Sequence, residues 1–175
     1  MQFSRYIFLI FTLSILASCT IKIKNTSLLG YNMPAHIIYA SQYLNFSEKT
    51  NRSQLHRLTG VDPVRTEWCA AFVNAVLEKN NIAGSNSLAA RSFLEWGEST
   101  DQPQRGDIVV FTRGNSNWQG HVGFYLDTVE YNNKIYYMIL GGNQDDKVSI
   151  MYYPKQLLIE TRKIKMLPDT ESIFL

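Results

Sequence analysis

Residues 67–73 read EWCAAFV and open the part of the chain with the clearest periodicity. From Cys69 onward, apolar side chains recur every three or four residues through Val73 and Leu77, which is the spacing of one face of a helix. The pattern stops at residues 80–84, NNIAG, where asparagine and glycine favour a turn. The spacing therefore predicts a helix that begins at Cys69 and packs its apolar face against a core.

Helical patterns surround this stretch, and strand patterns follow it. Helices are expected within residues 33–44, 52–58 and 86–97. Beyond Pro103 the apolar period changes from about 3.6 residues to about 2, which is typical of strands. The expected strands are residues 107–111, 122–126, 135–140 and 148–153, with a fifth in 157–166, and Asn132-Asn133 suits a tight hairpin turn. The order predicts an α+β fold, with N-terminal helices packed on an antiparallel sheet of about five strands.

The composition fits one globular domain. The chain has 175 residues, of which 45% are hydrophobic and 18% are charged, so it can bury a core without disulfides or a structural metal. The net charge of +2, with no basic stripe along the chain, argues against a nucleic-acid partner.

The N-terminus has the features of an export signal. Arg5 precedes a short apolar run, and residues 16–19, LASC, resemble the bacterial lipobox. We therefore expect a lipoprotein signal peptide at residues 1–18, lipidation of Cys19, a tether at residues 19–32 and the folded domain at residues 33–175. Thr20 implies an outer-membrane lipoprotein that faces the periplasm. An ordinary signal peptide or an uncleaved anchor is the alternative.

Lipidation of Cys19 would leave Cys69 without an intramolecular partner in an oxidising compartment. A cysteine at a helix N-terminus lies at the positive end of the helix dipole, which lowers the thiol pKa and favours the nucleophilic thiolate. We therefore expect an activated thiol at Cys69. The alternative is an inert cysteine that packs as a small apolar side chain.

His121 is the best candidate for a base that serves this thiol. It lies in residues 120–125, GHVGFY, where alternation places His121 and Gly123 on one face of a strand and Val122 and Phe124 on the other. The small glycines leave the imidazole approachable, although a purely structural histidine is the alternative. The other histidines, His36 and His56, are scattered, so no metal-ligand spacing is present and no metal or cofactor is expected.

A third residue should accept a hydrogen bond from the imidazole and fix its tautomer. Asn143, in residues 140–145, LGGNQD, is the favoured candidate because an amide oxygen can accept from a ring N–H. Its neighbours Gln144, Asp145 and Asp146 compete for the role. A plain turn at these residues is the remaining alternative.

Four motifs in order resemble the NlpC and CHAP branches of the papain-like cysteine hydrolases. They are WCAAFV at 68–73, GDIVVF at 106–111, GHVGFY at 120–125 and GGNQ at 141–144, and ARSFLEWG at 90–97 is similar to one bacterial and phage subgroup. The resemblance implies a papain-like fold in which Cys69 is the nucleophile, His121 the general base and then acid, and Asn143 the third member. Many NlpC relatives have a second histidine in that third place, and this chain has none after His121.

The implied function is a lipid-anchored cell-wall hydrolase that cleaves an amide bond in peptidoglycan stem peptides by acyl transfer. Trp68 is expected to bind substrate as a cleft wall, with a core position as the alternative. Charged groups of the peptide could contact Glu67, Arg91, Asp107 or Arg113, although a local salt bridge or a solvated surface position is the favoured interpretation for each of them. Two other functions stay open: a catalytically silent envelope binding or scaffold lipoprotein, and an acyltransferase on the same fold.

Overall fold

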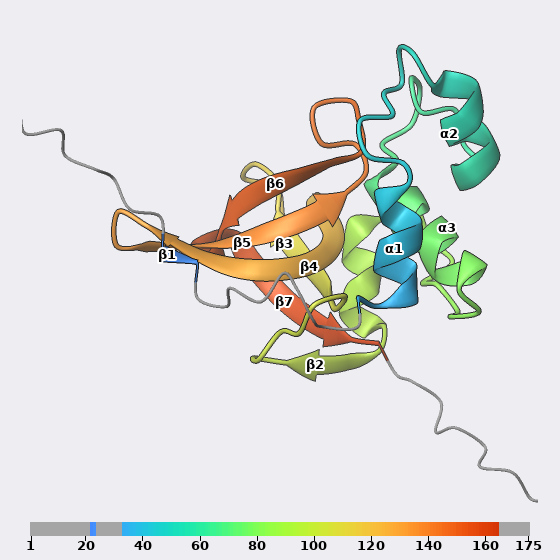
Figure 1. Cartoon of the computed structure of the whole chain (residues 1–175). Coiled ribbons are helices and arrows are strands. Elements are labelled where there is room, and N and C mark those ends of the chain that lie inside the picture. The colour runs from blue at the N-terminus through green and yellow to red at the C-terminus, as the bar shows by residue number, and fades with distance from the viewer. Residues whose placement is uncertain (1–21, 24–32, 165–175) are drawn as a thin grey trace, which may run out of the picture.

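Helices and an antiparallel sheet form the two layers of the molecule, with α1, α2 and α3 on one side of the strands (Figure 1). The computed structural model describes residues 22–23 and 33–164. The expected signal peptide, Cys19 and most of the tether lie outside these residues. The helices are α1 (Ala35–Ser41), α2 (Arg52–Thr59), α3 (Cys69–Lys79) and the 3₁₀ helices η1 (Ala90–Glu95) and η2 (Lys155–Leu157). The α+β class expected from the sequence is confirmed.

The sheet has the order β2-β7-β3-β4-β5-β6 in the described residues, and every pairing is antiparallel. Its strands are β2 (Glu98–Thr100), β3 (Ile108–Thr112), β4 (Gly120–Tyr131), β5 (Lys134–Gly141), β6 (Ser149–Pro154) and β7 (Leu158–Lys163). The two-residue β1 (Lys22–Ile23), within the expected tether, pairs with the far end of β4. Short β2 and β1 were not expected, because two or three residues are too few to show an alternating pattern.

The β4–β5 hairpin closes as the sequence predicts. Asn132 and Asn133 both have left-handed backbone angles, with φ of 49° and 57°. Positive φ at both central residues is the requirement of the tight turn that matches the twist of paired strands.

The helix expected in residues 86–97 is instead the short η1. Buried Asn74 of α3 binds the preceding loop: its side-chain oxygen accepts from the Ser85 N–H at 2.7 Å, and its amide donates to the Ser87 carbonyl at 2.8 Å. Asn86 is left-handed, with φ of 56°, and makes no helix cap. These contacts hold the loop in a non-helical conformation, and the helical turn begins only at Ala90.

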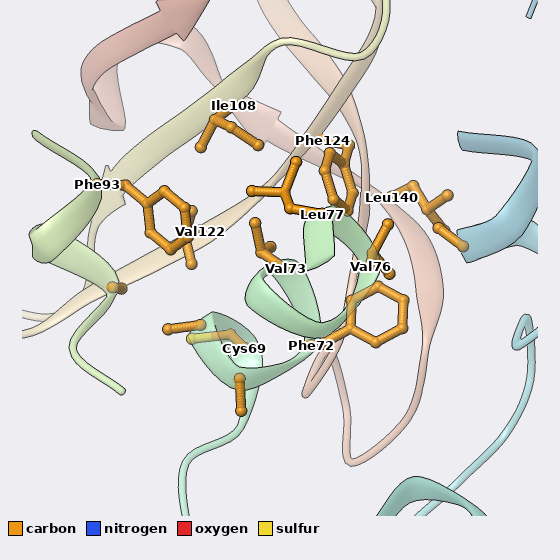
Figure 2. Close-up of a cluster of buried hydrophobic side chains, with 14 of the residues drawn as sticks. Cys69, Phe72, Val73, Val76, Leu77, Phe93, Ile108, Val122, Phe124 and Leu140 are labelled. Carbon is orange, nitrogen blue, oxygen red and sulfur yellow. The ribbon is translucent and has the colours of Figure 1, made fainter. Parts of the chain in front are cut away.

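Helix α3 is the centre of the core. Every residue from Cys69 to Leu77 is buried, and Figure 2 shows the apolar side chains of α3 facing Val122 and Phe124 of β4 and Leu140 of β5. Cys69 lies at the first turn of the helix, at one end of this cluster. The helix is covered by α1 and α2 as well as by the sheet, which is why residues off the predicted stripe are buried too.

Strand β4 separates two apolar clusters, as its alternation predicts. Val122 and Phe124 belong to the cluster that contains α3. Tyr125 belongs to a second cluster with Phe111, Tyr137 and other residues of β3 and β5. Because His121 alternates with Val122, its ring lies on the side of the second cluster, at the start of the strand.

Gly142 fills a position where the chain passes directly over α3. A Cβ at this residue would lie 2.6 Å from the Trp68 ring and 2.7 Å from the Phe72 Cβ. We expect Gly142→Ala to lower the free energy of unfolding by about 1–3 kcal/mol through overpacking. Urea unfolding measures the change. Gly114→Ala is the control, since its Cβ meets nothing closer than 3.9 Å and only its positive φ is strained. Equal losses in the two variants would contradict the packing argument.

Candidate active site

The N-terminus of α3 holds the Cys69 thiol against the start of β4. The sulfur accepts hydrogen bonds from the backbone N–H groups of Val122 and Ala70. Strand β5 pairs with β4 only from Phe124 onward, where Phe124 lies opposite Leu140, so the first residues of β4 are paired with β3 alone. Cys69 is 3% exposed and forms no disulfide.

His121, one residue before Val122, is held by a side-chain hydrogen bond and by stacking. Its Nε2 lies 3.1 Å from Oε1 of Gln144, which is itself 2% exposed. The ring of Tyr153 lies parallel to the imidazole, with 5.1 Å between ring centroids and an interplanar angle of 11°. The same tyrosine stacks on Phe111 of the second cluster.

The amide of Gln144 determines the tautomer of His121. Its Nε2 donates to the carbonyl oxygens of Ser149, at 2.6 Å, and Gly141, at 3.4 Å. Carbonyl oxygens only accept, so the amide cannot be reversed, and Oε1 must face the imidazole as an acceptor. The Nε2 of His121 therefore carries the proton, and Nδ1 of the neutral ring is the nitrogen left to accept one.

Cys69 and His121 lie in one neighbourhood. The sulfur contacts the backbone of the residue next to His121, and the charges of Arg113 and Glu67 act on both groups. Tyr153, which stacks on the imidazole, also has its pKa raised in part by Cys69. The structure thus brings the two residues that the sequence singled out to the same end of β4.

The protonation states differ from the sequence-based expectation. Burial raises the pKa of the Cys69 thiol, and this outweighs the lowering by the Val122 and Ala70 N–H groups and by Arg113. Burial also lowers the pKa of His121, to about 4. The expectation of a low thiol pKa was wrong for this state of the protein, because burial outweighs the helix N-terminus. At neutral pH the pair is a thiol and a neutral imidazole.

The depressed pKa of His121 makes stability depend on pH. Between about pH 6.5 and pH 4, the unfolded chain protonates this histidine while the folded chain does not. The unfolded state binds more protons, so the free energy of unfolding falls as the pH is lowered through this window, by up to about 3 kcal/mol. Urea unfolding of the wild type and His121→Gln at about pH 7 and pH 4.5 measures it. An equal pH effect in both proteins would contradict the assignment, because all other titrating groups are shared.

Asn143, favoured as the residue that orients His121, has a different partner. Its amide donates to Oε2 of Glu67 at 2.8 Å, while the imidazole pairs with Gln144. Left-handed φ angles of 55°, 53° and 60° at Asn143, Asp145 and Asp146 interrupt the strand alternation here. The turn directs the neighbouring Gln144 side chain inward.

Trp68 does not line an open cleft. Its side chain is fully buried, packs edge-on against Phe72 and donates from Nε1 to Glu48 at 3.3 Å. The sequence-based assignment of Trp68 to substrate binding is therefore corrected to a core position.

The four charged candidates divide into two groups. Arg91 donates to the Gln119 and Ser116 carbonyls, and Asp107 accepts from the Gln104 N–H, so both hold local structure. Glu67 and Arg113 form an exposed ion pair beside Cys69 and His121.

Within residues 22–23 and 33–164, no group of three or more His, Cys, Asp or Glu side chains is placed to hold a metal ion. The same residues contain no helix with the length and hydropathy to cross a bilayer.

The sequence favours Asn143 over Gln144 as the partner of His121 and gives no indication of Tyr153. Gln144 was visible as a neighbour in the GGNQ stretch, but no periodicity applies in a turn of left-handed residues. Tyr153 comes from β6, more than thirty residues after His121, and no local pattern connects the two.

The helices packed on an antiparallel sheet form an α+β domain whose fold is consistent with a CHAP or papain-like domain. The family model described as CHAP domain matches residues 61–143 of the chain, which supports the expected CHAP-like superfamily. The matched range contains Cys69, His121 and Asn143 and ends immediately before Gln144. No curated protein matches the chain at a significant level. A CHAP domain indicates a peptidoglycan-hydrolase or amidase-like function.

Proposed function

We propose that this chain is a lipid-anchored cysteine hydrolase that cleaves an amide bond in peptidoglycan stem peptides. Cys69 is the nucleophile, His121 the general base and then acid, and Gln144 the residue that orients the imidazole. The observation that carries the proposal is the hydrogen bond from His121 to Gln144 beside the Cys69 thiol, because it leaves Nδ1 as the proton acceptor.

The proposed reaction is acyl transfer through a thioester. As the sulfur of Cys69 attacks the amide carbonyl carbon, the thiol proton passes to Nδ1 of His121. The backbone N–H of Cys69, which as the first helical residue has no partner within the helix, donates to the oxyanion. The proton on Nδ1 then passes to the leaving amine, and the C–N bond breaks.

Water completes the cycle. His121 takes a proton from the water molecule as its oxygen attacks the thioester, and the C–S bond breaks to release a carboxylic acid. The proton returns to the sulfur of Cys69. A neutral resting pair suits this route, because the base must be unprotonated before each attack and the pKa of His121 is about 4.

The anchor is part of the proposal and rests on the N-terminal sequence. Lipid on Cys19 in the LASC stretch would hold the domain at the outer membrane, facing the periplasm and its wall substrate. In a membrane fractionation, Cys19→Ala should move the protein from the membrane fraction to the soluble fraction.

Digestion of purified sacculi tests the hydrolase. We expect the wild type to release soluble peptides with one new amine and one new carboxyl group per cut, and mass analysis of the products identifies the bond. Cys69→Ala is the control and should release none. Identical products from both proteins would refute hydrolysis by Cys69. Products joined to an added amine, with no free carboxylate formed, would indicate acyl transfer to an amine instead.

A further inference from the structure

Three side chains from separate segments meet beside the candidate active site: Glu67 from the turn before α3, Arg113 after β3 and Asn143 after β5. We call them the Glu67 cluster. Oε2 of Glu67 accepts from Arg113 Nη1 at 2.5 Å and from Asn143 Nδ2 at 2.8 Å. The side chains of Arg113 and Glu67 are 49% and 70% exposed, so the cluster lies at the surface.

The stability of the fold does not explain this cluster. Exposed ion pairs contribute little to the free energy of folding, because water screens the charges and the side chains lose freedom. An arrangement that joins three segments, through residues that contribute little to folding, suggests a role in binding.

Most of the hydrogen-bonding capacity of Arg113 is unused. A guanidinium has five N–H donors in a planar fork that fits a carboxylate with two parallel bonds. Of these, the bond to Glu67 uses one, and Arg113 makes no other hydrogen bond within the described residues. Its exposed edge can therefore take a second carboxylate while Glu67 holds the other side.

The position of Arg113 places such a ligand next to the reacting groups. Its positive charge reaches the Cys69 thiol, the His121 imidazole and the Tyr153 hydroxyl, and it favours the charged form of the thiol. An anion bound to Arg113 would lie close to the amide that Cys69 attacks.

We propose that Arg113 is a specificity-determining residue that binds a carboxylate of the substrate beside the cleaved amide, and that Glu67 and Asn143 are positioning residues that orient its guanidinium. This inference rests on the proposed amide hydrolysis and adds its substrate class: peptides with a free carboxylate near the cleaved bond. Asn143 then acts on Arg113 through Glu67 rather than on His121.

Matched peptide pools test the proposal. Soluble stem peptides are used either with free carboxylates or with those carboxylates converted to neutral methylamides. Arg113→Gln should lower kcat/KM for the free pool about 10- to 100-fold more than for the amidated pool, with the additional loss mainly in KM, because any effect of the Arg113 charge on Cys69 and His121 is common to both pools. Arg113→Lys should fall between, because it keeps the charge but not the fork. Arg57→Gln, at an exposed arginine of α2, is the control and should match the wild type.

Binding measured without turnover separates this inference from the proposed function. In the Cys69→Ala background, calorimetry should give tighter binding of the free pool than of the amidated pool, and Arg113→Gln should remove the difference. If neither pool is hydrolysed by the wild type, the proposed hydrolase fails, and these dissociation constants still decide the role of Arg113. A loss in Arg113→Gln that is equal for both pools, or absent for both, would overturn the inference.

Variants of Glu67 test the positioning role. Glu67→Gln keeps an acceptor for Arg113 and Asn143 and should retain most of the preference for free carboxylates. Glu67→Ala should reduce it, because the guanidinium is no longer held. Tighter binding of the free pool by Glu67→Ala would show that Glu67 competes with the substrate, and would refute its positioning role.

Discussion

Cys69→Ser is expected to lower kcat for peptide release by at least about 10⁴-fold. A serine hydroxyl is far less acidic than a thiol, and a neutral imidazole whose pKa is about 4 is too weak a base to deprotonate it. The substitution changes one atom in a buried position, so the fold should persist. The rate of soluble peptide release from sacculi measures the effect.

Stability must be measured beside activity for this variant. The midpoint of thermal unfolding of Cys69→Ser should lie close to that of the wild type, so that the loss of rate is not a loss of folded protein. A folded Cys69→Ser protein that keeps more than a few per cent of the wild-type rate would remove Cys69 from the proposed mechanism.

Gln144→Leu is expected to have the second largest effect. Leucine cannot accept from Nε2 of His121 or donate to the Ser149 and Gly141 carbonyls, so buried polar groups lose their partners and the tautomer is no longer fixed. We expect a loss of about 2–5 kcal/mol in the free energy of unfolding and of about 100-fold or more in kcat. Urea unfolding and sacculus digestion measure the two quantities.

Gln144→Glu separates the tautomer from simple packing. A protonated glutamic acid can accept from His121 and donate to Ser149 as the amide does, whereas an ionised one would turn a second acceptor toward that carbonyl. We therefore expect the activity of Gln144→Glu, relative to the wild type, to be higher at about pH 5 than at about pH 8. A ratio that does not change with pH would contradict the role of the amide.

The helix that begins at Cys69 and the strand that carries His121 could be predicted because their apolar patterns are long and regular. Cys69 begins a stripe that runs for two turns, and His121 begins a strand whose alternation separates two apolar clusters. In both cases the regular spacing of apolar residues determines the face on which each side chain lies, so these orientations can be predicted from the sequence.

The residue that orients His121 could not be selected in the same way. Asn143 and Gln144 are adjacent, both carry an amide, and they lie where left-handed residues break the alternation. Which amide turns inward depends on the Gly141 and Ser149 carbonyls, and Ser149 belongs to the next strand. The burial of Trp68 and the raised pKa of Cys69 likewise depend on packing among distant segments, which no local pattern reports.

The hydrogen bond from the Gln144 amide to the Ser149 carbonyl links the candidate site to an edge strand of the sheet. Ser149 is the first residue of β6, and β6 is an outermost strand. Local fraying of this edge strand would free the amide, let the imidazole rotate and abolish the proposed activity while the rest of the molecule stays folded. Heat inactivation should therefore set in below the temperature at which the whole domain melts.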